Sequence, residues 1–184
     1  MNIGIDIDDT LTNTKELQIK YWQEYFFKKP HSNYTKELPS NINDFGDDYI
    51  GTFWDNYREA LFAPPIKENA SLIIKKLNQE GHQLCIITSR PDNKYPNLKK
   101  RILTWFQEND INITEINTNI RDKALFCKEH NIDLLIDDSI THIKNATEYN
   151  IKTILFNKIP QYKGLKTDNW LELYNIIHTI KTPK

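Results

Sequence analysis

The sequence predicts an α/β protein with a doubly wound, Rossmann-like parallel sheet and a small helical cap inserted after the first strand. Short runs of β-branched and apolar residues alternate with segments of helical periodicity, which is typical of βαβ units. About sixty residues separate the first such run, 1–7, from the helical pattern that starts at 68, too many for a simple crossover. We therefore expect an α/β core formed by 1–13 and 66–184 and a small helical cap formed by 14–65.

Continuous apolar runs define the predicted strands. The first run, 1–7, enters an acidic turn, and the run at 132–136 is followed by Asp137 and Asp138. Uninterrupted apolar strands are typical of a parallel sheet that helices cover on both faces. The remaining strands are predicted at 84–88, at 151–156 and, from a weaker pattern, at 114–118.

Helical periodicity fills the segments between these strands. In the core, the pattern that begins at 68 stops at Gly81, a common helix terminator. In the cap, two aromatic-rich helices flank a proline-bounded loop at 30–39. The predicted helices are 14–28 and 47–62 in the cap, and 68–79, 98–109, 122–130 and 140–149 in the core.

Composition excludes several classes of protein. The chain has 184 residues, of which 27% are charged and 39% hydrophobic, with a net charge of −1. This balance argues against binding long nucleic-acid polymers, which need a strongly basic surface. Two separated cysteines, Cys85 and Cys127, are expected to be buried thiols. Without a signal-peptide pattern or a membrane-length apolar run, the sequence predicts a cytoplasmic protein with no membrane partner.

The acidic residues after the strands carry the predicted chemistry. Asp6 and Asp8 are two residues apart, so strand periodicity points both carboxylates to one side. One carboxylate can attack phosphorus, and the other can act as general acid and then base. Asp137, with Asp138 acting through a water, could join Asp6 in holding Mg²⁺. The competing interpretation is a set of solvated turns, with Asp138 as a helix N-cap.

Hydroxyl and basic groups complete a phosphate site. Thr88 ends the second predicted strand and Ser89 follows it, and both could bind phosphate oxygens. In the simpler interpretations, Thr88 is an ordinary strand residue and Ser89 caps a turn. Lys123 opens a helix, which favours an anion there. Arg90 either contacts substrate or forms an ion pair. Three other lysines compete with Lys123 for the phosphate: Lys94, Lys99 and Lys100.

Four motifs together resemble the haloacid dehalogenase (HAD) superfamily of phosphohydrolases. Each motif alone is a weak signal, but all four occur in the family's order across most of the chain. One departure is Asp9, where many members have glycine. The matching residues are Asp6-Ile7-Asp8-Asp9-Thr10, Ile86-Ile87-Thr88-Ser89, Lys123 and Leu134-Leu135-Ile136-Asp137-Asp138.

The resemblance implies a role for each matching residue. It implies that Asp6 is the nucleophile and Asp8 the acid and base. It also implies a Mg²⁺ site formed by Asp6, the backbone carbonyl of Asp8, and Asp137. Thr88 and Lys123 would bind phosphate.

A more specific resemblance is to the C-type 5′(3′)-deoxyribonucleotidases and their bacterial relatives. It rests on the first motif, Phe53-Trp54 in the cap, Ile87-Thr88-Ser89-Arg90-Pro91 and Ile136-Asp137-Asp138-Ser139. It implies hydrolysis of a deoxyribonucleoside monophosphate. Four cap aromatics could stack on the base or form the core of the cap: Phe45, Phe53, Trp54 and Tyr57.

Alternative functions remain open at this point. The same chemistry could act on a sugar phosphate, and a protein of another class could keep the scaffold as a non-catalytic phosphate-binding module. The expected partner is a small phosphoester, with a homodimer left open. Four histidines lack metal-ligand spacing and receive no role: His82, His130, His142 and His178.

Overall fold

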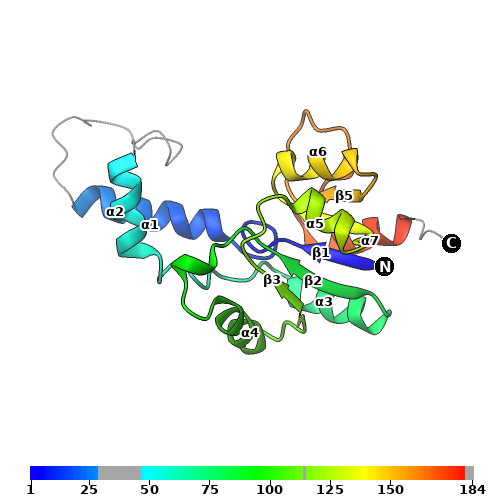
Figure 1. Cartoon of the computed structure of the whole chain (residues 1–184), viewed down its shortest axis with the longest axis horizontal. Coiled ribbons are helices and arrows are strands. Elements are labelled where there is room, and N and C mark those ends of the chain that lie inside the picture. The colour runs from blue at the N-terminus through cyan, green and yellow to red at the C-terminus, as the bar shows by residue number, and fades with distance from the viewer. Residues whose placement is uncertain (29–46, 114, 181–184) are drawn as a thin grey trace. The chain divides into compact units, whose positions relative to one another are not determined.

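The computed structural model describes residues 1–28, 47–113 and 115–180 (Figure 1). The chain divides into two compact units, one made of Met1–Thr12 with Ile66–Lys184 and the other of Asn13–Pro65. Among the described ranges, no helix has the length and apolar character needed to cross a membrane. The predicted loop at 30–39 and the cap residue Phe45 lie outside these ranges.

The larger unit contains a five-stranded parallel sheet with the strand order β3-β2-β1-β4-β5. Ile5 of β1 pairs with Ile86 of β2 on one side and with Ile136 of β4 on the other. The strand order reverses at β1, and ligands of doubly wound sheets bind beyond the carboxyl ends of strands at such a switch point. This arrangement confirms the predicted fold. The strands are β1 (Asn2–Ile5), β2 (Gln83–Ile87), β3 (Glu115–Asn117), β4 (Leu134–Asp137) and β5 (Lys152–Leu155).

Helices cover both faces of this sheet. α5 and α6 pack against each other, as do α3 and α7. Right-handed crossovers place α3 and α4 on one face and α5 and α6 on the other. The helices are α3 (Ala70–Gln79), α4 (Leu98–Glu108), α5 (Lys123–Glu129), α6 (Ile140–Glu148) and α7 (Trp170–Thr179), with a 3-10 turn η2 at Asp92–Lys94.

A hydrophobic cluster fills the face covered by α5 and α6. It includes Cys85 of β2, Cys127 of α5 and Leu135 of β4, all buried. Gly4 lies beside it in the central strand, where a Cβ atom would stand 2.3 Å from Cδ1 of Ile87. A side chain at this position would therefore force Ile87 to move, which glycine avoids.

The C-terminal helix α7 lies beyond the last predicted element. The side chain of Asn169 caps it by accepting hydrogen bonds from the backbone N–H groups of Leu171 (2.9 Å) and Glu172 (3.0 Å). Trp170 is buried, and its indole N–H donates to the carbonyl of Thr10 at 3.2 Å. This helix thus supports the loop that follows β1.

The smaller unit contains α1 (Thr14–Lys28) and α2 (Asp47–Tyr57), so the predicted helix 47–62 ends earlier than expected. Phe53 is fully buried, with its ring centroid 4.8 Å from that of Trp22 and 5.2 Å from that of Tyr57. Of the two predicted roles of Phe53, the structure thus shows packing in the core of the smaller unit. Trp54 is half-buried, its ring 5.6 Å from that of Phe53.

Candidate active site

A tight turn follows β1 and carries the first acidic motif. The backbone N–H of Asp6 donates to the carbonyl of Ile136 at 3.0 Å, so Asp6 is still anchored to β4. The carbonyl of Ile7 accepts hydrogen bonds from the backbone N–H groups of Leu11 (3.0 Å) and Thr12 (3.2 Å). Asp6 is buried, whereas the side chain of Asp8 is 37% exposed. The turn therefore presents one enclosed and one accessible carboxylate.

Lys123 joins the ends of β1 and β4 through its side chain. Its buried ammonium donates to Oδ1 of Asp6 at 2.5 Å and to Oδ2 of Asp137 at 2.6 Å. Burial alone would lower the pKa of Lys123, but the charges of Asp6 and Asp137 raise it above its ordinary value. The ammonium is therefore charged at neutral pH and holds the two carboxylates together.

Asp137 is held by donors on three sides. Besides Lys123, its Oδ1 accepts a hydrogen bond from the backbone N–H of Ser139 at 2.8 Å, and Nδ1 of His142 lies 3.1 Å away. A carboxylate only accepts, so Nδ1 carries the proton in this contact. Burial opposes ionisation, yet His142 and Lys123 lower the pKa of Asp137. His142, for which no role was predicted, thus orients this carboxylate.

Three carboxyl groups converge at this edge of the sheet. One oxygen from each of Asp6, Asp137 and Asp138 lies within 4.8 Å of the other two, a grouping found only here among the described residues. Asp138 does not cap α6, because Ser139 precedes that helix. The N-cap alternative for Asp138 is therefore wrong.

The electrostatics of this group favour an additional cation. Burial, with the charges of Asp137 and Asp8, raises the pKa of Asp6 well above its usual range, despite Lys123. Burial and the charges of Asp137 and Asp9 raise the pKa of Asp138 to about 7. Lys123 alone therefore does not neutralise the cluster. Carboxylate oxygens are the ligands that Mg²⁺ prefers, so the donor set fits that ion.

The residues after β2 complete this edge of the sheet. Thr88 is buried, and its Oγ1 accepts a hydrogen bond from the backbone N–H of Arg90 at 3.2 Å. Ser89 is exposed and its hydroxyl donates to the carbonyl of Ile120 at 2.8 Å. Arg90 forms an ion pair with Asp8, at 2.7 Å between Nη2 and Oδ1. Arg90 was predicted either to contact substrate or to form an ion pair, and the structure shows the ion pair.

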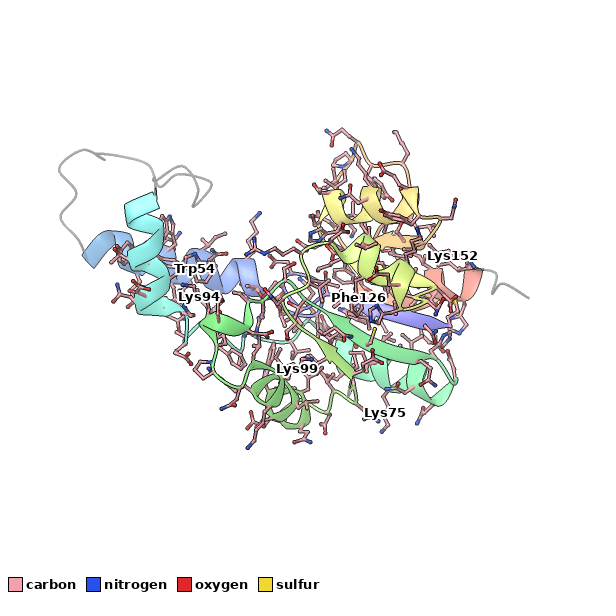
Figure 2. The ribbon with its side chains drawn as sticks, in the orientation of Figure 1. Trp54, Lys75, Lys94, Lys99, Phe126 and Lys152 are labelled. Carbon is pink, nitrogen blue, oxygen red and sulfur yellow. The ribbon has the colours of Figure 1, made fainter. Side chains whose placement is uncertain are left out.

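The other candidate lysines lie on different elements. Figure 2 labels Lys94 on η2 and Lys99 on α4, and both side chains are exposed, as is that of Lys100. Lys123, in contrast, is buried between two carboxylates. From the sequence, only its position at a helix start favoured it over the other lysines.

Comparison with known proteins identifies the fold. No protein-family model matches the sequence, and no curated protein matches it. A haloacid dehalogenase-like family hydrolase from Streptococcus pneumoniae is similar in structure, with a TM-score of 0.65 and 13% identity, over 96% of this chain and 97% of that one. The chain has the fold of the HAD hydrolases.

Two further solved structures share this HAD fold. A predicted phosphoglycolate phosphatase from Haemophilus somnus has a TM-score of 0.65 and 15% identity, over 96% of this chain and 97% of that one. A HAD-hydrolase from Bacillus subtilis bound to magnesium has a TM-score of 0.64 and 14% identity, with the same coverage of 96% and 97%. The finer resemblance to deoxyribonucleotidases stays a prediction.

Proposed function

We propose that this protein is a phosphomonoester hydrolase in which Asp6 is the nucleophile. The observation that carries the proposal is the buried ammonium of Lys123 between Asp6 and Asp137, at the switch point of a HAD-type sheet. A carboxylate in this position can attack phosphorus, provided that nearby positive charge offsets the charge of the phosphate.

The reaction has two steps. Asp6 attacks the phosphorus, the bond to the leaving oxygen breaks, and Asp8 gives that oxygen a proton. Asp8 then takes a proton from a water that attacks the aspartyl phosphate, which releases inorganic phosphate and restores Asp6. Thr88, Ser89 and Lys123 bind the phosphoryl oxygens. The accessible Asp8 and the enclosed Asp6 support this division of roles.

Mg²⁺ is the proposed cofactor. It would be held by Asp6, Asp137, Asp138 and the backbone carbonyl of Asp8. When bound, it would offset the negative charge of the phosphate and of the acidic cluster. The raised pKa values of Asp6 and Asp138 support this choice, because burial and the neighbouring carboxylates disfavour their charged forms, which a bound cation would favour.

The proposed substrates are nucleoside monophosphates, with sugar phosphates as the second candidates. The sequence motifs that resemble those of deoxyribonucleotidases support the first class, while the structural similarity to a predicted phosphoglycolate phosphatase supports a small non-nucleotide phosphate. A non-catalytic phosphate-binding module is the remaining alternative, and a buried nucleophile with an adjacent acid and base speaks against it.

Replacement of Asp6 tests the mechanism. Asp6→Asn should reduce phosphate release by at least about a thousandfold while the protein stays folded, since an amide cannot form the acyl phosphate. The measurement is phosphate release with Mg²⁺, and excess EDTA should abolish it in the wild type. Asp110→Asn is the matched control, because this exposed aspartate precedes β3 at the opposite edge of the sheet. Turnover by Asp6→Asn at the wild-type rate would refute the mechanism.

A substrate panel separates the two substrate classes. It contains nucleoside 5′- and 3′-monophosphates in ribo and deoxy forms, sugar phosphates, phosphoglycolate and p-nitrophenyl phosphate. A kcat/KM that is highest for nucleotides supports the nucleotidase proposal, whereas a higher value for sugar phosphates or phosphoglycolate replaces it. Absence of turnover on every ester supports the binding module.

A further inference from the structure

Arg90 binds the carboxylate of Asp8 with two hydrogen bonds. Its Nε donates to Oδ2 at 2.9 Å and its Nη2 donates to Oδ1 at 2.7 Å. Two parallel N–H···O bonds between a planar guanidinium and a carboxylate fix the plane of the carboxylate as well as its position. Asp8 is thereby held in one orientation although its side chain is 37% exposed.

Arg90 is itself fixed from several directions. Its backbone N–H donates to Oγ1 of Thr88, and its carbonyl accepts the N–H of Asn119 at 2.9 Å. The guanidinium carbon lies 5.6 Å from the ring centroid of Trp105 on α4, and the Arg90 side chain is only 7% exposed. A buried guanidinium that lies over an aromatic ring loses little freedom on pairing, so it can hold a partner rigidly.

The proposed reaction uses the carboxyl group of Asp8 twice at one place. The leaving oxygen receives a proton from it, and the attacking water, which enters where that oxygen leaves, later returns a proton to it. Small displacements of a catalytic group can cost large factors in rate. A carboxyl group on an accessible turn therefore needs a partner that fixes it, and each of its oxygens has a second lone pair beyond the one that Arg90 occupies.

We propose that Arg90 is the positioning residue for Asp8 and acts through that carboxylate rather than by binding the phosphate of the substrate. This inference rests on the proposed function of the site. It differs from the substrate-binding role that the sequence left open, because two donor groups of Arg90 bind Asp8 and the guanidinium lies buried over the ring of Trp105.

The test measures the activity of four variants on two aryl phosphates of similar size. Phenyl phosphate has a basic leaving group that needs a proton, whereas p-nitrophenyl phosphate needs one far less. The variants are Arg90→Gln, Asp8→Asn, their double variant, and Arg101→Gln. Arg101 is the matched control, because it lies over another aromatic ring, that of Tyr95, at 6.0 Å.

Arg90→Gln should lower kcat on phenyl phosphate by about 10- to 100-fold, a part of the 10²–10⁴ that general acid–base catalysis contributes. The loss on p-nitrophenyl phosphate should be smaller, KM should stay near the wild-type value, and Arg101→Gln should match the wild type. The double variant should be no slower than Asp8→Asn, since both changes remove one function.

Several outcomes would overturn the inference. A raised KM with unchanged kcat would make Arg90 a substrate contact, and losses that multiply in the double variant would make the two residues independent. Equal losses on both esters would indicate a structural role. Circular dichroism and thermal unfolding check folding, and Arg90→Lys, which keeps the charge without the two-point contact, replaces Arg90→Gln if that variant is unfolded. A wild-type protein inactive on every ester would refute the proposed function together with the inference. An active wild type with any of the other outcomes would refute only the role of Arg90.

Discussion

At the scale of single residues, Asp9 shows how the turn after Asp6 is formed. Its φ of 58° lies in the left-handed region, which costs a residue with a Cβ roughly 1–2 kcal/mol relative to glycine. Aspartate tolerates this region better than most residues. The departure from the glycine of many HAD members thus leaves the turn in a glycine-like conformation.

Two substitutions at Asp9 isolate this backbone effect, because both remove the side-chain interactions. We expect Asp9→Gly to exceed Asp9→Ala in free energy of unfolding by about 1 kcal/mol, since only alanine keeps a Cβ. Urea unfolding of both variants measures the difference. At Asp92, in the 3-10 turn η2, the order should reverse. Equal stability of the two Asp9 variants would contradict the prediction.

The sequence could predict the site wherever strand ends determined it. Asp6 and Thr88 follow β1 and β2, and Asp137 ends the adjacent β4, so the topology alone brings them to one edge. His142 was missed because its contact depends on which side of α6 faces β4; the available signal was its position five residues after Asp137. Nor could the choice between the two roles of Arg90 be made, because it depends on a rotamer and on the distant Trp105.

At the scale of elements, α5 depends strongly on its first turn. It has only seven residues, and the Asp122 side chain caps it by accepting the N–H of Leu125 at 2.9 Å. Helices this short are marginal without caps and packing. Since Lys123 is the first residue of α5, the cap also positions the ammonium between the two carboxylates.

Removal of this cap should therefore affect both stability and turnover. We expect Asp122→Ala to lower the free energy of unfolding by about 1 kcal/mol and to lower kcat, because the backbone that carries Lys123 loosens. Asp122→Asn keeps a capping oxygen and should retain both properties. Urea denaturation and phosphate-release assays provide the measurements, and an alanine variant as stable as the asparagine variant would show that the cap is dispensable.

The accuracy of the predicted elements follows from their hydrophobic patterns. Helix 14–28 agrees with α1 residue for residue, and every predicted strand overlaps an observed one. Strand ends differ by up to two residues because apolar residues continue into buried turns, as at Ile7. Helix α7 was not predicted, although Asn169 followed by Trp170, Leu173 and Ile177 carries the signal of a capped amphipathic helix.

At the scale of the whole molecule, both cysteines report on the integrity of one core. Cys85 and Cys127 are free thiols in the same hydrophobic cluster, contributed by a strand and a helix. Burial raises the pKa of each to about 12. They are thus protected both sterically and by protonation.

Thiol labelling should therefore follow global unfolding. At pH 8 we expect both native thiols to react with a disulfide reagent on the order of a thousandfold more slowly than a free thiol, because the reactive thiolate is scarce. In urea, both should react along the unfolding transition. Lys144→Cys, at an exposed position of α6, should add one fast thiol. Rapid labelling of either wild-type cysteine in buffer would contradict this packing.

The chain leaves the larger unit and returns to it through neighbouring residues. Thr12 and Ile66 form an antiparallel bridge, Lys67 donates to the carbonyl of Leu11 at 2.9 Å, and Asn13 donates to that of Pro65 at the same distance. Any foreign segment whose ends lie one strand spacing apart, about 4.8 Å, could be spliced in at this junction. Recombination could in this way place a new segment at this junction while the larger unit stays unchanged, so that the inserted unit and the proposed chemistry diversify separately.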